Sequence, residues 1–200
     1  MFSIQYVSHR VASMYNGLYR RRILKHYARA WGCGGEDAVF LKGPTHELPA
    51  DFSVRLFPPT KHRAYWVYAT CSMSQPDDCR GLELHMFSRY RSPEPVELLY
   101  VTAHFHRYGE ELGWGHTVSF GRPWIDDSHC DHGFISTPYM DGPKLEVLRL
   151  PRGKSISCLW LLPVTKEEVE FKKKAGIEAL EQRFESAKLN YLDPKRKSLC

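Results

Sequence analysis

Apolar positions recur at two different spacings along the chain, and each spacing predicts a different kind of element. Spacings of three and four residues predict helices over 14–31, 92–109 and 165–188. Short segments rich in aromatic and β-branched residues, separated by Pro, Gly and Asp clusters, predict strands between these helices. The order helix, strands, helix, strands, helix favours an α+β fold with a mixed, largely antiparallel sheet flanked by three main helices.

The three predicted helices have recognisable ends. The sequence GCGG stops the first helix after Trp31, and Gly109 stops the second. Thr165 and Glu168 have the spacing of a capping box and begin the third helix. The residues expected on the buried faces are Met14, Leu18, the stem of Arg21, Leu24 or Lys25, Tyr27 and Trp31 in the first helix, Leu98, Val101, Thr102 and Phe105 in the second, and Val169, Ile177, Leu180, Phe184 and Ala187 in the third.

Several segments are predicted as strands. Four of them form a predicted meander over about 38–88, namely AVFLKG, FSVRLFPP, YWVYATCSM and GLELHMFS. Three more follow the second helix, namely HTVSF, FISTPYM and KSISCLWLLPV. The last of these, residues 154–164, is apolar on both faces, which is typical of a central strand.

Composition and charge narrow the class of protein. The chain has 200 residues, of which 42% are hydrophobic, and this suits one domain over residues 1–200 with a sizeable core. The net charge of +5 is mild, and the basic runs Arg20–Arg22 and Lys172–Lys174 are expected to be solvated faces. No export signal and no membrane-length apolar run is visible. We expect a cytoplasmic protein with six reduced cysteines and no nucleic-acid or membrane partner.

Histidines and acids gather between residues 104 and 132 and suggest a metal site or a hydrolytic centre. The cluster contains His104, His106, His116, Asp126, Asp127, His129, Cys130, Asp131 and His132. On a helix, His104 and His106 project to opposite sides and cannot bind one ion together, although either of them could join His116 and His132. The other hypothesis is a Cys130 nucleophile with a histidine base. The turn-forming sequence DDSHCDHG favours local hydrogen bonds instead, so we assign no catalytic, metal-binding or cofactor-binding residue.

The segment LGWGHTVSFGRPW, Leu112 to Trp124, combines three glycines with two tryptophans. Glycines beside large rings indicate a tight backbone turn with the rings covering apolar surface. Trp114 and Trp124 either close an edge of the core or anchor a partner protein. We interpret the segment as a structural corner that also offers a binding surface.

Four long motifs occur in the order found in one known family. They are LGWGHTVSFGRPW, CDHGFISTPYMDGPKLE, CLWLLPVTKEE and GIEALEQRFESAKLNYLDPKRKS. Together they resemble the Suppressor of fused-like domain, chiefly its bacterial members. The first half of the chain agrees more loosely, through ILKHYARAWG, which is similar to the opening helix of the family, and DFSVRLFPPTKHRAYWVYATCSMS, which is similar to a strand pair. The resemblance spans about residues 23–198.

The resemblance implies a compact α+β module that binds proteins and has no catalytic residues or cofactor. Bacterial members of the family are thought to serve largely as immunity proteins of toxin systems. Animal members sequester transcription factors, and their ligand lies between two domains. Because the chain resembles only the first of those domains, we expect its partner to be a toxin protein rather than a transcription factor.

The expected partner-binding residues lie in the corner segment or shortly after it and are Trp114, His116, Arg122, Asp131 and His132. An edge strand of the 38–88 meander is the next candidate surface, because a partner can add a strand to it. The alternative function is a metal- or histidine-dependent hydrolase that uses the cluster of residues 104–132.

Overall fold

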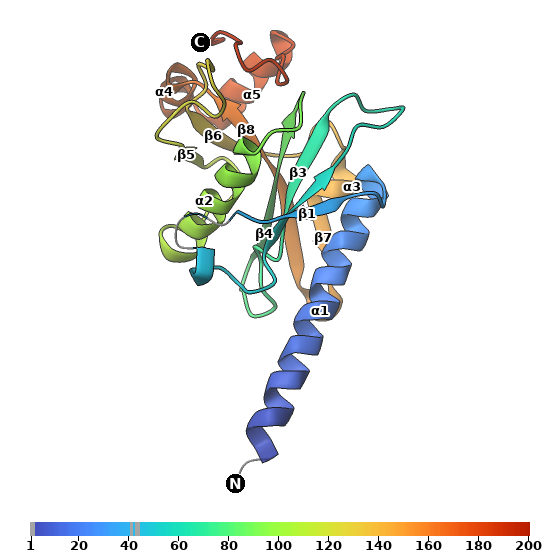
Figure 1. The fold of residues 1–200 in the computed structure, drawn as a ribbon. Helices are drawn as coiled ribbons and strands as arrows, with labels where there is room; N and C mark the ends of the chain where they lie inside the picture. The colour runs from blue at the N-terminus through green and yellow to red at the C-terminus, as the bar shows by residue number, and fades with distance from the viewer. Residues whose placement is uncertain (1–2, 41, 43–44) are drawn as a thin grey trace.

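An eight-stranded sheet organises the computed structural model, which describes residues 3–40, 42 and 45–200, with side chains from Asn16 onward (Figure 1). The strands are β1 (Glu36–Ala38), β2 (Ser53–Phe57), β3 (Trp66–Cys71), β4 (Gly81–Ser88), β5 (Thr117–Ser119), β6 (His132–Ser136), β7 (Val147–Arg149) and β8 (Ser155–Val164). The helices are α1 (Ser3–Trp31), α2 (Glu94–Tyr108), α3 (Pro143–Glu146), α4 (Lys166–Ala175) and α5 (Ile177–Ser186), with short 3-10 turns η1 (Thr45–Glu47) and η2 (Pro151–Gly153).

The strands lie in the order β1-β2-β3-β4-β8-β6-β5, and β7 pairs with the first residues of β8. Neighbouring strands run antiparallel except at the centre, where β4 and β8 are parallel and Gly81 lies opposite Ile156. The central position predicted for β8 is confirmed, and its apolar residues are buried on both faces. The mixed, largely antiparallel sheet of an α+β fold is confirmed as well.

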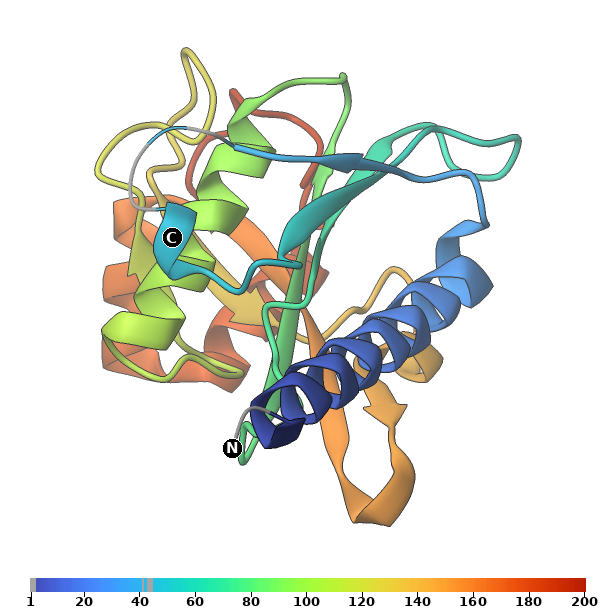
Figure 2. The same cartoon turned by 60° about the horizontal axis from the view of Figure 1, so that its bottom comes forward.

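Each face of the sheet supports its own hydrophobic core. On one face, Leu99 of α2 belongs to the same cluster as Leu161 of β8. On the other face, Ile23 of α1 and Leu180 of α5 belong to the cluster of Trp160. Figures 1 and 2 show α1 and α2 on opposite sides of the strands. Surfaces built around α2 and around α5 are therefore separated by the sheet.

The first helix ends where the sequence predicts, begins earlier than predicted, at Ser3, and buries part of the predicted face, since Tyr27 and Trp31 are buried. Gly32 follows Trp31 with a φ of +90°, a conformation that favours glycine and ends the helix. The buried side chains recur at intervals of four residues and are Tyr19, Ile23, Tyr27 and Trp31. Leu18 is 49% exposed, so its predicted burial is wrong. The side chain of Met14 lies outside the described residues.

The second helix keeps its predicted ends and half of its predicted face. It stops at Gly109, as the sequence indicates. Leu98 and Thr102 are buried as predicted, but Val101 and Phe105 are exposed. The buried side chains are Pro95, Val96, Leu98, Leu99, Tyr100, Thr102 and Ala103. The helix is thus rotated relative to the predicted face, which leaves an apolar strip on its outer side.

The third predicted helix is two helices, α4 and α5. The predicted capping box is confirmed, because Thr165 Oγ1 accepts from the Glu168 amide while the Glu168 carboxylate accepts from the Thr165 amide. Gly176, with a φ of +96°, then separates α4 from α5. Burial is confirmed for Val169, Leu180 and Phe184, is partial for Ile177, and is wrong for Ala187, which lies exposed after α5.

The chain that follows α5 returns to α4 through Arg196. The buried Arg196 guanidinium binds both oxygens of the fully buried Glu168, at 2.6 and 2.7 Å, and donates to the Pro163 carbonyl at 2.9 Å. Leu199 N adds a hydrogen bond to Glu168. This pairing fixes the segment 187–199 against the face of the sheet that α5 covers.

Two predicted strands differ from the structure. The segment AVFLKG begins at Ala38, where β1 already ends, so its prediction as a strand is wrong for the described residues; Leu41 and Gly43 lie outside them. The strand predicted in FISTPYM stops at Ser136, two residues before Pro138, which cannot donate a ladder hydrogen bond. The elements α3 and β7 occupy a stretch for which the sequence predicts no element.

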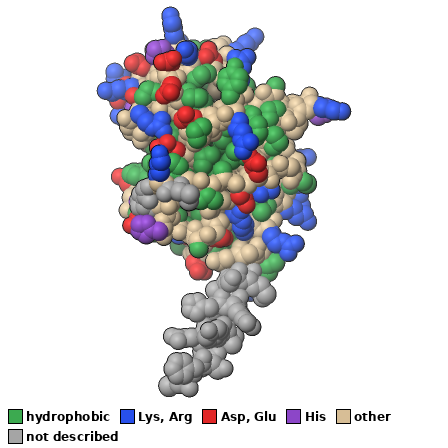
Figure 3. Space-filling model, in the orientation of Figure 1, with side chains coloured by type: hydrophobic (Ala, Val, Ile, Leu, Met, Phe, Trp, Pro, Cys, Tyr) green, Lys and Arg blue, Asp and Glu red, His purple; other side chains and the backbone are tan. Residues whose placement is uncertain are grey.

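On one face of the molecule, charged side chains of both signs are intermixed (Figure 3). On the face shown in Figure 3, Lys and Arg side chains alternate with Asp and Glu. The two basic runs are largely solvated, as predicted, although Arg20 pairs with Asp37 at 2.9 Å and Lys172 donates to the Gly115 carbonyl at 2.6 Å. Within the described part of the chain, no helix is both long and apolar enough to cross a membrane.

Candidate functional site

The corner segment of residues 112–120 lies at a free edge of the sheet. Gly115 has a φ of +83°, and a Cβ atom there would lie 2.2 Å from Ile177 Cδ1 of α5. Only glycine fits this turn, which explains one of the glycines in the motif. The turn leads into β5, the last strand of the sheet, which pairs with β6 alone.

The outer backbone of β5 is open to a further strand. The His116 carbonyl accepts from Ile135 N, and Phe120 N donates to the Asp131 carbonyl, both toward β6. In an antiparallel ladder the bonded residues alternate, so the amide and carbonyl groups of Thr117 and Ser119 face away from β6. Such an edge is a template for strand addition by a partner.

Two hollows flank the corner segment. The first, here called the α2–β5 groove, has a volume of about 550 Å³ and is lined by the exposed Val101 and Phe105 of α2 together with β5 and Lys172. The second, the Trp114 hollow, has a volume of about 610 Å³ and contains the 47% exposed Trp114. His116 lines both hollows, so it stands between them.

Trp114 and Trp124 have different environments. Trp124 is buried in the cluster beneath α2, whereas Trp114 presents about half of its surface to solvent. Of the two roles that the sequence leaves open, Trp124 closes the core edge. Trp114 has the exposure of a contact residue.

The structure divides the predicted partner-binding residues into two groups. Trp114 and His116 lie at the end of β6 that carries Ile135. Arg122, Asp131 and His132 lie at the other end. Arg122 pairs with Glu97 of α2 at 2.8 Å, and His132 Nδ1 lies 2.6 Å from Asp131 Oδ1. The second group is therefore engaged in local polar contacts, while the first borders the hollows.

The histidines of the 104–132 cluster have separate partners. His104 binds Glu47, and His106 Nδ1 accepts from Leu112 N at 2.8 Å. Burial lowers the pKa of His106, which suits this acceptor role. Cys130 is buried, which raises the pKa of its thiol to about 11 and disfavours the nucleophilic thiolate. The described residues contain no group of three or more His, Cys, Asp or Glu side chains arranged for a metal ion.

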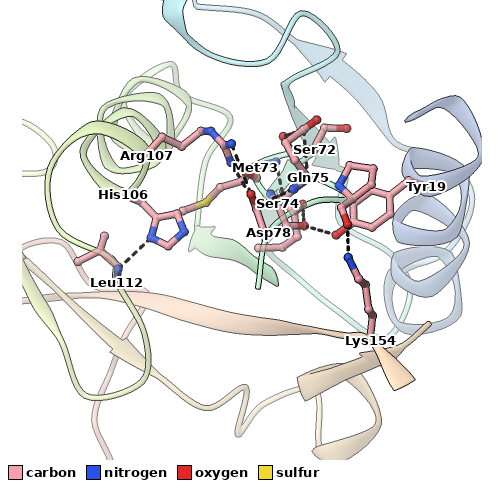
Figure 4. Close-up of polar contacts among 12 residues, drawn as sticks. Tyr19, Ser72, Met73, Ser74, Gln75, Asp78, His106, Arg107, Leu112 and Lys154 are labelled. Carbon is pink, nitrogen blue, oxygen red and sulfur yellow. Dashed lines mark hydrogen bonds and ion pairs between the residues drawn. The ribbon is translucent and has the colours of Figure 1, made fainter. Parts of the chain in front are cut away.

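A polar loop connects α1, α2 and the residue before β8. The loop was not singled out from the sequence. Figure 4 shows the loop of residues 72–78, which receives Tyr19 of α1, Arg107 of α2 and Lys154 near β8. Arg107 donates to the Met73 carbonyl at 3.0 Å and pairs with Asp78 at 3.2 Å. The run SMSQPDD after an apolar strand is the sequence pattern that could have indicated it.

A fully buried carboxylate lies under this loop. Glu83 accepts from Thr70 Oγ1 at 2.5 Å, from Ser74 Oγ at 2.9 Å and from Ser74 N at 3.1 Å. Burial raises the pKa of Glu83 to about 7, and these hydrogen bonds oppose the shift. All of these partners are internal, so Glu83 holds the loop against β3 and β4 and does not form an open site.

Comparisons with known proteins agree with this architecture. A SUFU (suppressor of fused protein) homolog from Neisseria gonorrhoeae FA 1090 is 30% identical, with a TM-score of 0.77, over 91% of this chain and 97% of that one. The Sufu-Fu complex structure matches 90% of this chain and 92% of that one at 12% identity and a TM-score of 0.67. Drosophila Suppressor of Fused matches 88% of this chain but 50% of its own, at 13% identity and a TM-score of 0.65.

The two matches at 12% and 13% identity show a shared fold. No curated protein matches the sequence. The family model for Suppressor of fused protein (SUFU) matches residues 49–197, which include β2 to β8 and every helix after α1. This chain belongs to the Suppressor of fused protein family.

Proposed function

We propose that this protein is a non-enzymatic protein-binding module that neutralises a partner toxin in the manner of an immunity protein. In this proposal residues 1–200 act as one domain, since both cores share one sheet. Family membership supports protein binding, because one structural neighbour is the Sufu-Fu complex. The toxin as partner is supported by the similarity to bacterial members, of which the N. gonorrhoeae protein is 30% identical.

The observation that carries the proposal is the free edge of β5 between two hollows. A partner strand laid along Thr117 and Ser119 would gain main-chain hydrogen bonds, and its side chains would enter the α2–β5 groove. Trp114 beside it offers a large amphipathic ring, a residue type enriched among interface anchors. His116 contributes polar contacts from between the hollows.

The immunity role is tested by expressing the reading frame directly upstream of this gene, with and without this chain. Growth should stop when the upstream protein is made alone and should recover when wild-type chain is made with it. Unimpaired growth in both strains would contradict the toxin as partner.

The surface is tested by the affinity of the chain for that partner. Trp114→Ala should weaken binding by at least about 2 kcal/mol, because a central aromatic anchor is lost. The exposed ring makes a large loss of folding stability unexpected. Tyr90→Ala is the matched control, since Tyr90 is also an exposed aromatic residue but lies outside the hollows. Equal affinities of the two variants would remove Trp114 from the interface.

Asp131→Lys tests the second group of predicted residues. If Asp131 and His132 also touch the partner, reversing this charge should weaken binding by about 2 kcal/mol. Unchanged affinity of the folded variant would restrict the interface to the end of the hairpin that carries Trp114 and His116.

A further inference from the structure

A third hollow lies on the opposite face of the sheet from the α2–β5 groove. It has a volume of about 590 Å³ and runs between α5, the turn that follows β6 and the segment after α5. We call it the acidic groove. Its floor is apolar and includes Trp160 and Leu162 of β8 and Phe184 of α5, all of which are buried.

The lip of the acidic groove carries large apolar side chains that face solvent. Tyr139 is 61% exposed and Met140 is 50% exposed, and both line the opening. Adjacent exposed side chains of this size above a buried apolar floor are typical of contact surfaces. Methionine in particular adapts its shape to different ligands.

The opposite rim carries three acidic side chains and one exposed basic one, Lys188, so acidic groups are in excess. Glu178, Glu181 and Glu185 follow one another at intervals of three and four residues, so they share one side of α5. Glu181 accepts a hydrogen bond from Ser136 Oγ at 2.8 Å. Among the described residues, none of these three carboxylates forms an ion pair. The row is negative in a protein whose net charge is +5, so it differs in sign from the molecule as a whole.

The floor also holds a hydrogen-bond donor without an acceptor. The Trp160 side chain is buried, and within the described part of the chain its Nε1–H has no partner. The nitrogen itself has almost no exposed surface, and the ring packs edge-on against Tyr191 with ring centroids 5.2 Å apart. The indole is therefore part of the closed apolar floor on which a ligand would rest.

We propose that the acidic groove binds a short segment of a partner protein in which a large apolar side chain is flanked by Lys or Arg. The apolar side chain packs on Phe184 between the lip residues Tyr139 and Met140. The flanking cations meet the glutamate row of α5, which selects them by charge. This site does not depend on the proposed toxin-binding surface, because it shares no lining residue with the α2–β5 groove or the Trp114 hollow.

The test is a selection of random 12-residue peptides on the immobilised full chain, followed by affinity measurements on the enriched peptides. Enriched peptides should carry an aromatic or large aliphatic residue with at least two Lys or Arg nearby. The double variant Glu178→Gln/Glu185→Gln should bind the enriched peptides at least tenfold more weakly than wild type. Added salt should weaken peptide binding further. Both glutamates are exposed, and their carboxylates make no hydrogen bond within the described residues, so the variant should fold.

Glu167→Gln/Glu170→Gln on α4 is the matched control, because it removes the same charge from the neighbouring helix. Its peptide affinities should stay within twofold of wild type. The proposal is overturned if no peptide is enriched or if the enriched peptides bind both double variants equally. Enriched peptides that lose affinity only for the Trp114→Ala variant would support the toxin-binding surface and would also overturn this proposal. A chain dimer that Glu178→Gln/Glu185→Gln dissociates would assign the groove to a second copy instead.

Discussion

Two fully buried glutamates, Glu83 and Glu168, are accommodated in opposite ways. Glu83 is surrounded by hydroxyl and amide donors from Thr70, Met73 and Ser74, and no cation pairs with it among the described residues. Glu168 receives the two-pronged guanidinium of Arg196. The first carboxylate is stabilised by neighbours within a short stretch of chain, and the second by a residue far along the sequence.

Because of this difference, Glu83 is sensitive to pH, whereas Glu168 holds two segments of the chain together. Without a cation, desolvation dominates at Glu83 and raises its pKa to about 7. With Arg196, Glu168 instead links α4 to the segment that supplies Leu189 and Tyr191 to the acidic groove. Glu83 thus orders the loop of residues 72–78, and Glu168 orders the segment beside the acidic groove. Removing their partners should have effects of different size.

The largest effect is expected for Arg196→Met. The change leaves Glu168 buried without its cation, and breaking a buried pair in this way costs about 3–5 kcal/mol of unfolding free energy. Urea unfolding followed by circular dichroism measures the loss. The double variant Glu168→Gln/Arg196→Met should recover part of it, because no charge then remains buried. A loss below about 1 kcal/mol, as expected for a surface arginine, would contradict a stabilising role of the buried Arg196–Glu168 pair.

A smaller effect is expected from the pH dependence that Glu83 produces. Its pKa is about 7 in the folded chain and near its ordinary value of 4.5 when unfolded, so the folded state binds more protons between these values. Stability should therefore fall as pH rises from about 4.5 to 7, by up to about 3 kcal/mol. Glu83→Gln should remove this component. The stabilities of the two proteins, measured at each pH, should diverge across that window; parallel curves would show that Glu83 does not titrate there.

Thr70→Val is expected to cost about 2 kcal/mol, because a buried acid loses one donor and the Leu84 amide loses its acceptor. The substitution preserves the shape of the side chain, so packing changes little. Thermal unfolding provides the measurement, with Thr117→Val on the edge strand as the control. Equal melting temperatures for the two variants would mean that the Thr70 hydroxyl beside Glu83 contributes nothing to the stability of the fold.

The smallest effect is expected for Thr165→Ala, which removes the side-chain half of the capping box of α4. The expected loss is about 1 kcal/mol, the usual value of an N-cap. Ser186→Ala near the end of α5 serves as the neutral control. Partner binding at the Trp114 side should not change, and a melting temperature identical to wild type would argue against the cap.

Local signals in the sequence were sufficient for three helix boundaries, namely the ends of α1 and α2 and the start of α4. The Thr165 capping box and the glycines at 32 and 109 each act on their own helix, so no knowledge of the rest of the fold is needed. The buried face of a helix was less predictable than these boundaries. Val101 and Phe105 repeat at helical spacing but lie outside, because the packing of α2 on the sheet, and not its own periodicity, decides which side is covered.

The candidate site was predictable as a segment but not as a surface. Trp114 and Trp124 both stand beside Gly or Pro, and nothing local distinguishes the exposed ring from the buried one. The edge position of β5 follows from the insertion of β8 between β4 and β6, a long-range pairing that no short window contains. The acidic groove depends likewise on Arg196 returning the chain to α4.

The parallel pairing of β4 with β8 bears on how the chain reaches this structure. Gly81 must find Ile156 across several intervening elements, and closing so long a loop slows folding before any contact compensates the lost entropy. During synthesis the β1–β4 meander leaves the ribosome with the inner edge of β4 uncovered until β8 follows. That interval, rather than the finished surface, is when this protein is most prone to aggregate or to need a chaperone.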